Sequence, residues 1–250
     1  MKILACDTSN KACSVCLWED GKVIDTRFRN DGLTHSQTFM PMMHDLMEKN
    51  GCTYEELDAI ACTVGPGSFT GIRIGVSAVK TMAMVIEKPA VPVSSLEAMA
   101  WALRGEDALV VPLIDCRNHR AWAAAYYKGE QVLPEAASDV DEIREKCLSW
   151  RENNIPGKKI LLIGTGAKIF LENDIPDTEY KEGLDEILPE NAAAVAGKSV
   201  EGTDAKTLLS KYPAAALMPV YLSKTQAERT AGEQGKEVKE IPIRYYSTND

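Results

Sequence analysis

The chain opens with short apolar runs separated by polar turns. Residues 3–7 and 12–18 alternate with polar turn residues, and Asp20-Gly21 is a typical hairpin turn before the run at 22–29. This pattern predicts three antiparallel strands in a meander.

A helical pattern follows over residues 34–50. Thr34 is the expected N-cap, and Gln37 stands three residues later, where it completes a capping box. Pro41 lies inside the pattern and should kink the helix or delay its regular start. Gly51 is a normal residue to follow a helix end.

The next segment alternates strands and helices. The apolar run at 58–64 predicts a buried strand, residues 71–88 a helix, and residues 90–93 a short strand. Ser94 then caps another helix, with Glu97 as its capping-box partner. The order of elements is therefore β-β-β-α-β-α-β-α.

The second half of the chain repeats this order at a constant offset. Asp7 and Asp115 stand 108 positions apart, as do Asn10 and Asn118, and Gly21 and Gly129. The matching elements are strands at 108–115, 121–127 and 159–164, a helix at about 139–152, and a short helix after Gly164-Thr165-Gly166. The matches fall at the strand end and at the two turns that define a meander, so they indicate an internal duplication.

This organisation divides the chain into three parts. We expect an N-terminal domain at 1–104, a C-terminal domain at 105–225 and a polar, mobile tail at 226–250. The C-terminal domain ends in an Ala-rich helical stretch at about 190–217. Residues 241–246 could add one edge strand.

Two such units, each with an acidic residue ending its first strand, predict a duplicated α/β fold of the actin/Hsp70/sugar-kinase type, which is ribonuclease H-like. In that fold a nucleotide lies between the domains. Asp7, Thr8, Ser9 and Asp115 hold the matching positions and predict a vestigial nucleotide site. The alternative is that these residues only form turns after strands.

A glycine-rich turn lies between the strand at 58–64 and the next helix. Backbone N–H groups at such a turn suit an anion. However, Thr70 stands where both the Walker loop and the dinucleotide motif require glycine. We therefore interpret Gly65, Gly67, Gly71 and Arg73 as a structural turn with close helix–strand packing.

Composition narrows the possible functions. The net charge is −9 and the pI is about 5.0, which argues against an extended nucleic-acid surface. No apolar run approaches the ~20 residues of a membrane span, and Asp7 interrupts the N-terminal apolar run too early for a signal peptide, so we expect a cytoplasmic protein. The seven cysteines should be reduced, mostly buried thiols. The three histidines are badly spaced for metal ligation, and we expect no metal site.

Several motifs together resemble the bacterial TsaB (YeaZ) family. They are residues 3–9, His35-Ser36, Gly65-Pro66-Gly67-Ser68-Phe69-Thr70-Gly71-Ile72-Arg73, Pro92-Val93-Ser94-Ser95-Leu96, Asp115-Cys116-Arg117 and Pro219-Val220-Tyr221-Leu222. The resemblance covers about residues 1–225, and it departs from the family at Cys116, where alanine is usual. It implies a non-catalytic partner in tRNA threonylcarbamoyladenosine (t6A) biosynthesis, with no catalytic residue and no cofactor.

The same resemblance implies the partners. The catalytic paralogue, a TsaD-type transferase subunit, would modify adenosine 37 of ANN-decoding tRNAs, and a TsaE-type ATPase would join the complex. The chain would contact tRNA only through this complex, would not bind membranes, and would form a homodimer when alone.

The two helices at 35–50 and 71–88 are rich in apolar residues, and six of the nine methionines lie on them. Methionine is frequent at surfaces that adapt to partners. We predict that these helices form the dimerisation face. The candidate interface residues follow helical spacing: Phe39, Met43, Met47, Val79, Met82 and Ile86. The alternative is that these side chains belong to the core.

Two other functions remain open from the residues. An ATP-dependent small-molecule kinase of the same superfamily would bind Mg-ATP tightly. A metallopeptidase would need metal ligands, which the histidine spacing does not favour.

Overall fold

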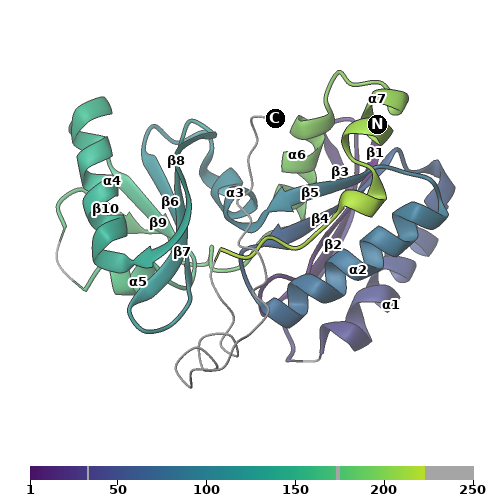
Figure 1. Cartoon of the computed structure of the whole chain (residues 1–250), viewed down its shortest axis with the longest axis horizontal. Coiled ribbons are helices and arrows are strands. Elements are labelled where there is room, and N and C mark those ends of the chain that lie inside the picture. Colours follow the sequence, from purple (N-terminus) through teal and green to yellow (C-terminus); the bar gives the residue numbers. More distant parts are fainter. Residues whose placement is uncertain (33, 173–174, 223–250) are drawn as a thin grey trace, which may run out of the picture.

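Two five-stranded sheets, lying side by side, form the framework of the chain (Figure 1). The structure is a computed structural model, and it describes residues 1–32, 34–172 and 175–222. The predicted tail at 226–250 and the edge strand at 241–246 lie outside the described residues.

The strands follow the predicted meanders closely. The first sheet contains β1 (Lys2–Asp7), β2 (Cys13–Glu19), β3 (Lys22–Arg29), β4 (Ala59–Gly65) and β5 (Ala90–Ser94). The second sheet contains β6 (Leu109–Asp115), β7 (Arg120–Tyr127), β8 (Glu130–Asp139), β9 (Ile160–Ile163) and β10 (Thr178–Tyr180). The sequence analysis listed no strand for β8 or β10. Strand β10 is short and only half-buried, and only the turn at Gly129 pointed to β8.

The two sheets have the same topology. The first has the order β3-β2-β1-β4-β5, and the second has β8-β7-β6-β9-β10. In both, the first strand of the meander pairs antiparallel with the second strand and parallel with the fourth. This correspondence confirms the duplicated actin-like α/β fold.

The helices lie close to their predicted positions. They are α1 (His35–Lys49), α2 (Phe69–Val85), α3 (Ser95–Ala100), α4 (Val140–Asn154), α5 (Ala167–Phe170), α6 (Pro189–Val200) and α7 (Ala205–Lys211). Three short 3-10 turns are η1 (Tyr54–Glu56), η2 (Trp101–Leu103) and η3 (Ala214–Ala216).

Of the two predicted helix caps, the side-chain cap at Thr34 is wrong and the cap at Ser94 is present. Thr34 is the N-cap of α1, but its side chain makes no capping bond, so the capping box with Gln37 was wrong. Ser94 caps α3 and accepts from the backbone N–H groups of Leu96 and Glu97. Its hydroxyl then donates to the carboxylate of Glu135, which lies on the second sheet.

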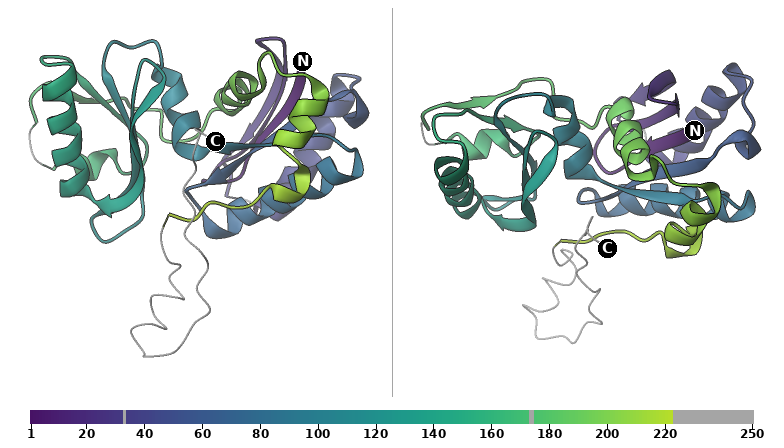
Figure 2. Two further views of the ribbon diagram at one scale, coloured as in Figure 1. Left: turned by 45° about the horizontal axis from the view of Figure 1, so that its top comes forward. Right: turned by 90° about the horizontal axis from the view of Figure 1, so that it is seen from above.

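The two faces of the first sheet are covered by different helices. Helices α1 and α2 pack on one face together with the chain segment at 214–222, and α6 packs on the other (Figure 2). Within α1, Pro41 is accommodated inside the helix. In the described part of the chain, no helix has the length and apolar character needed to cross a bilayer.

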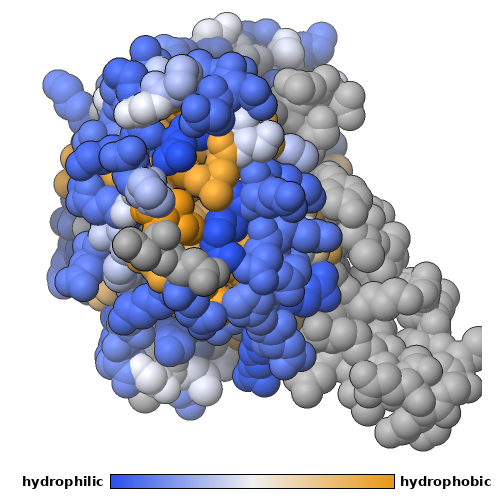
Figure 3. Space-filling model, turned by 90° about the vertical axis from the view of Figure 1, so that its left-hand side faces the viewer, coloured by the Kyte–Doolittle hydropathy of each residue, from blue (hydrophilic) through white to orange (hydrophobic). Residues whose placement is uncertain are grey.

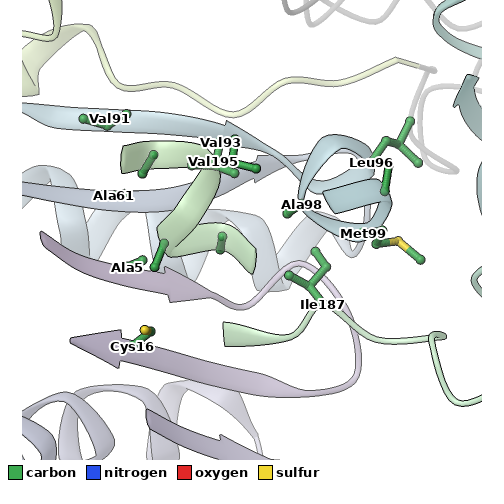
Figure 4. Packing of buried hydrophobic residues seen from close by; sticks show 14 of the residues in the cluster. Ala5, Cys16, Ala61, Val91, Val93, Leu96, Ala98, Met99, Ile187 and Val195 are labelled. Carbon is green, nitrogen blue, oxygen red and sulfur yellow. The ribbon is translucent and has the colours of Figure 1, made fainter. Parts of the chain in front are cut away.

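Helices α3 and α6 hold the two sheets together. Each is the first helix after the last strand of its own sheet, yet α3 packs against β6 and β7, and α6 packs against β1 and β2. Their apolar faces merge with both sheets into one buried cluster, which Figure 4 shows around Ala5, Val93, Leu96, Met99 and Val195. The division into 1–104 and 105–225 stays a prediction, because the last helices of the second part lie on the first sheet.

Candidate functional site

Asp7 ends β1 and is buried, with 1% of its surface exposed. Its Oδ1 atom accepts hydrogen bonds from Ser9 N at 2.9 Å, from Ser9 Oγ at 2.6 Å and from the hydroxyl of Thr63 on β4. Its Oδ2 atom is buried without a hydrogen-bond partner among the described residues. The first predicted site residue is therefore tied into the protein rather than presented at the surface.

The electrostatics of Asp7 follow from this burial. Desolvation raises the pKa of Asp7 above its usual value of 3.8, and the hydrogen bonds from Ser9 and Thr63 partly oppose the rise. Burial likewise raises the pKa of Glu186, which accepts from Ala12 N at 3.4 Å and lies close enough for Asp7 to raise that pKa further. Thr63 and Glu186 were missed from the sequence, because nothing in the pattern links them to Asp7.

The glycine-rich turn closes directly over the loop at Asp7. Ser68 N donates to Ser9 O at 2.6 Å, and Thr8 Oγ1 donates to Gly71 O at 2.8 Å. A Cβ atom on Gly67 would lie 2.2 Å from Ser9 O, and one on Gly71 would lie 2.0 Å from Thr8 O. Because turn and loop are in direct contact, no phosphate group fits between them.

A segment from the end of the described chain covers the other side of the turn. Val220 N donates to Val64 O at 2.8 Å, and a Cβ atom on Gly65 would lie 2.6 Å from Val220 O. The guanidinium of Arg73 donates from Nε to Tyr221 Oη at 2.8 Å and lies 3.7 Å from the centroid of the Phe69 ring. Arg73 thus connects α2 to this segment by its hydrogen bond to Tyr221, and its guanidinium also lies 5.7 Å from the centroid of the Tyr221 ring.

Asp115, the predicted counterpart of Asp7, is exposed at the end of β6. Its Oδ1 accepts from Arg117 N at 2.7 Å, and its own N–H donates to Thr165 Oγ1 at 3.0 Å. Both contacts lie within the second unit. The structure therefore brings Asp7, Thr8 and Ser9 together but gives Asp115 separate partners.

Four of the six predicted interface residues are buried and do not lie on the surface. Phe39, Met43, Met47 and Val79 are buried in the core between the first sheet and helices α1 and α2. The i, i+4 spacing of 39, 43 and 47 marks the stripe of α1 that faces the sheet, and this stripe was mistaken for a partner surface. Met82 and Ile86 are only partly buried and remain candidates.

Other apolar side chains on the same two helices are exposed. Met40 on α1 is 46% exposed, and Met84 and Val85 at the end of α2 are 55% and 77% exposed. They were not selected from the sequence, because they lie outside the stripe that the periodicity emphasises.

Neither the cysteines nor the acidic cluster at the start of α4 indicates a reactive or metal-binding site among the described residues. The seven cysteines all lie within the described residues and form no disulfide there, and burial raises the pKa of Cys62 and Cys147, the latter to about 12. His119, Asp139 and Asp141 bring one possible metal-ligand atom each within 4.8 Å of one another. However, Asp139 caps α4 and Asp141 pairs with Arg144 of the same helix, so both carboxylates already have structural partners.

The outer end of the second unit has a mixed surface. Figure 3 shows apolar side chains reaching the surface in the middle of this face, with hydrophilic residues around them. An open hollow on α4 and β8 is lined by Leu133, Glu145, Lys146, Ser149, Trp150, Asn153 and Asn154. This lining offers no convergent group of acids and bases, so it does not suggest a catalytic site.

Comparison with known proteins gives a consistent result. Residues 32–228 match the family model described as TsaD, tRNA N6-adenosine threonylcarbamoyltransferase. The chain is 32% identical over 187 residues to the tRNA threonylcarbamoyladenosine biosynthesis protein TsaB of Escherichia coli K12, an alignment that covers 74% of this chain and 78% of that relative. It is 37% identical over 139 residues to TsaB of Bacillus subtilis, covering 54% of this chain and 61% of that relative.

Solved structures agree with the sequence relatives. YeaZ from Pseudomonas aeruginosa is 28% identical and superposes with a TM-score of 0.67 over 88% of this chain and 99% of its own. A second structure from the same organism, described as similar to peptidase YeaZ, is 26% identical with a TM-score of 0.69, over 89% of this chain and 99% of its own.

Proposed function

Because the chain belongs to the bacterial TsaB (YeaZ) family, we propose that it is the non-catalytic scaffold and dimerisation subunit of a tRNA-modifying complex. The complex transfers a threonylcarbamoyl group to adenosine 37 of ANN-decoding tRNAs. The chain binds the TsaD-type transferase subunit, a TsaE-type ATPase joins the assembly, and the chain works in the cytoplasm.

The proposal that this chain is not the catalyst rests on the contact of the glycine-rich turn with the Asp7 loop. In an active enzyme of this fold the strand-end aspartate must reach a phosphate or its metal ion. Here Asp7 is buried beneath the glycine-rich turn, and its Oδ1 is occupied by Ser9 and Thr63. The net charge of −9 supports contact with tRNA only through partner subunits.

An assay of the separated subunits tests this function. We expect the purified chain to show no threonylcarbamoyl transfer and no proteolysis, and to stimulate transfer when the TsaD-type paralogue and the TsaE-type ATPase of its own genome are added. Turnover by the single chain that is lost in Asp7→Ala would overturn the proposal.

The partner face lies on the outer side of helices α1 and α2. Met82 and Ile86 remain from the sequence prediction, and the exposed Met40, Met84 and Val85 extend the same surface. Burial of one such side chain is worth roughly 1.5–3 kcal/mol. A few of them would account for the affinity, both for a second copy of this chain and for the paralogue.

Charge substitutions test this face. Met82→Glu and Val85→Glu should abolish the homodimer and the complex with the paralogue, since each would bury an unpaired carboxylate. Leu209→Glu is the matched control, because Leu209 is an exposed apolar residue on α7, outside α1 and α2. Sedimentation velocity measures association, and circular dichroism checks folding. Folded variants that still associate would place the interface elsewhere.

The kinase alternative makes a different prediction for nucleotide binding. We expect calorimetry with Mg-ATP to give a dissociation constant in the high micromolar range or weaker, equivalent to about −5 kcal/mol or less favourable. Low-micromolar binding that disappears in Asp7→Ala would favour the kinase.

A further inference from the structure

A buried hydrogen bond links the two units at the end of β5. The hydroxyl of Ser94, the last residue of β5, donates to Oε1 of Glu135, which lies on β8 of the other sheet. The same hydroxyl accepts from Leu96 N and Glu97 N, each at 3.2 Å, and so caps α3. Because α3 packs against β6 and β7, this contact lies at the joint, the region where the two units pack together.

Glu135 is an unusual residue for such a place. Only 5% of it is exposed, and its Oε2 atom has no hydrogen-bond partner among the described residues. Buried carboxylates are normally paired with a cation or fully hydrogen-bonded. The charged group that acts on Glu135 is instead a second carboxylate, that of Glu97 on α3.

The other charges at this joint act mainly on Glu97. Lys198 on α6 attracts the Glu97 carboxylate, and Glu130 at the start of β8 repels it. Lys198 is itself paired with Glu130 at 3.0 Å, across the two units. Lys198 is therefore already paired with the exposed carboxylate of Glu130.

From this arrangement we propose that Ser94, Glu135 and Glu97 form a pH-sensitive latch between the two units. When Glu135 is neutral, it stays in the joint and keeps the bond to Ser94. When Glu135 is ionised, a buried charge lies beside the Glu97 carboxylate, and the joint loosens locally. These three residues lie outside the partner face on α1 and α2, and the inference does not depend on the proposed tRNA-modification function.

The direction of the pH effect follows from the pKa of Glu135. Burial raises this pKa from 4.5 to about 7, the repulsion from Glu97 adds to the rise, and the bond from Ser94 partly opposes it. A raised pKa in the closed state stabilises that state at low pH, and the stabilisation is lost as the pH rises to about 7. Above that pH, both states are ionised and the effect levels off.

Hydrogen exchange of the full chain tests the latch. We expect the opening equilibrium of peptides covering 91–100 and 130–138, corrected for intrinsic exchange, to rise up to about tenfold per pH unit between pH 5 and 7. Peptides in the core of the first sheet that contain no buried carboxylate, such as residues 13–18, should change less. In Glu135→Gln the rise should flatten. Glu142→Gln, an exposed residue on α4, is the matched control and should follow the wild type.

A second variant covers the case in which Glu135→Gln does not fold. Glu97→Gln removes the like charge, so the levelling of the exchange curve should move to lower pH. The proposal is overturned if the wild type shows no rise between pH 5 and 7, if folded Glu135→Gln keeps the full rise, if Glu97→Gln levels at the wild-type pH, or if all core peptides open together.

Discussion

Asp7 and Asp115 hold the same position in the two copies of the duplicated unit, but their surroundings differ. Each ends the central strand of its sheet, and each is followed by a turn that hydrogen-bonds to the aspartate. Asp7 is almost completely buried and Asp115 is exposed. Copies of one topology therefore do not imply copies of one site.

The difference comes from what covers each strand end. In the first unit, the glycine-rich turn begins the 17-residue helix α2, which packs on the Asp7 loop, and the segment containing Val220 and Tyr221 closes over the turn. In the second unit, the corresponding turn at Gly164 and Gly166 leads into the four-residue helix α5. Its glycines pack on Leu113 of β6 and leave the carboxylate of Asp115 in solvent.

Adding a methyl group to the two turns should give the largest difference between the units. Gly71→Ala places Cβ 2.0 Å from the backbone oxygen of Thr8, which cannot move without shifting β1, so we expect a loss of about 3 kcal/mol or more. Gly166→Ala meets Leu113 Cβ at 3.0 Å and should cost less. Gly105→Ala, with open space around it, is the neutral control. Denaturant unfolding measures all three, and equal losses for Gly71→Ala and Gly105→Ala would contradict the close contact.

Removing the two carboxylates tests their burial directly. Asp7→Ala leaves the hydroxyls of Ser9 and Thr63 buried without their acceptor and should reduce the free energy of unfolding by about 2–3 kcal/mol. Asp115→Ala should stay within about 0.5–1 kcal/mol, because Asp115 is exposed. Urea unfolding at pH 7 compares the two. Similar losses would mean that the two strand ends are equivalent after all.

The pH dependence of stability separates the two aspartates further. Because burial raises the pKa of Asp7, the folded state binds its proton more tightly than the unfolded state. The resulting stabilisation is present below pH 3.8 and is lost as the pH rises through the folded-state pKa. Asp7→Asn does not titrate, so its stability relative to the wild type should increase with pH over this range, by at most about 1.4 kcal/mol per pH unit. Asp115→Asn is the matched control, and identical curves for Asp7→Asn and the wild type would contradict the buried carboxylate.

The smallest expected effect concerns the segment that covers the first turn. Tyr221→Phe removes the acceptor of the Arg73 hydrogen bond and should cost about 0.5–1 kcal/mol. Hydrogen exchange of peptides covering 65–72 should increase in this variant. Tyr127→Phe removes a bond to Asp107 in the second unit and serves as the control, because it should leave those peptides unchanged. An unchanged exchange rate in Tyr221→Phe would show that the segment does not hold the turn closed.

The sequence by itself determined the local elements, the duplication and the family. Apolar runs between turns predicted eight of the ten strands of the described chain, because backbone periodicity and turn chemistry are local properties. The constant offset between Asp7 and Asp115 gave the duplication, and the motif at Gly65–Arg73 pointed to the family. The close packing of the glycines also followed from the sequence, because only glycine allows such an approach of backbones.

Tertiary structure alone decided which apolar faces are buried. Helical spacing placed Phe39, Met43 and Met47 on one stripe, but it could not tell whether that stripe faces the sheet or a partner. Three other features are likewise invisible in the sequence. They are the packing of α3 on the second sheet and of α6 on the first, the closure of the glycine-rich turn over Asp7, and the contact of Ser94 with Glu135. Each depends on residues far apart in the chain, and their burial arises only when the two sheets pack around a shared core.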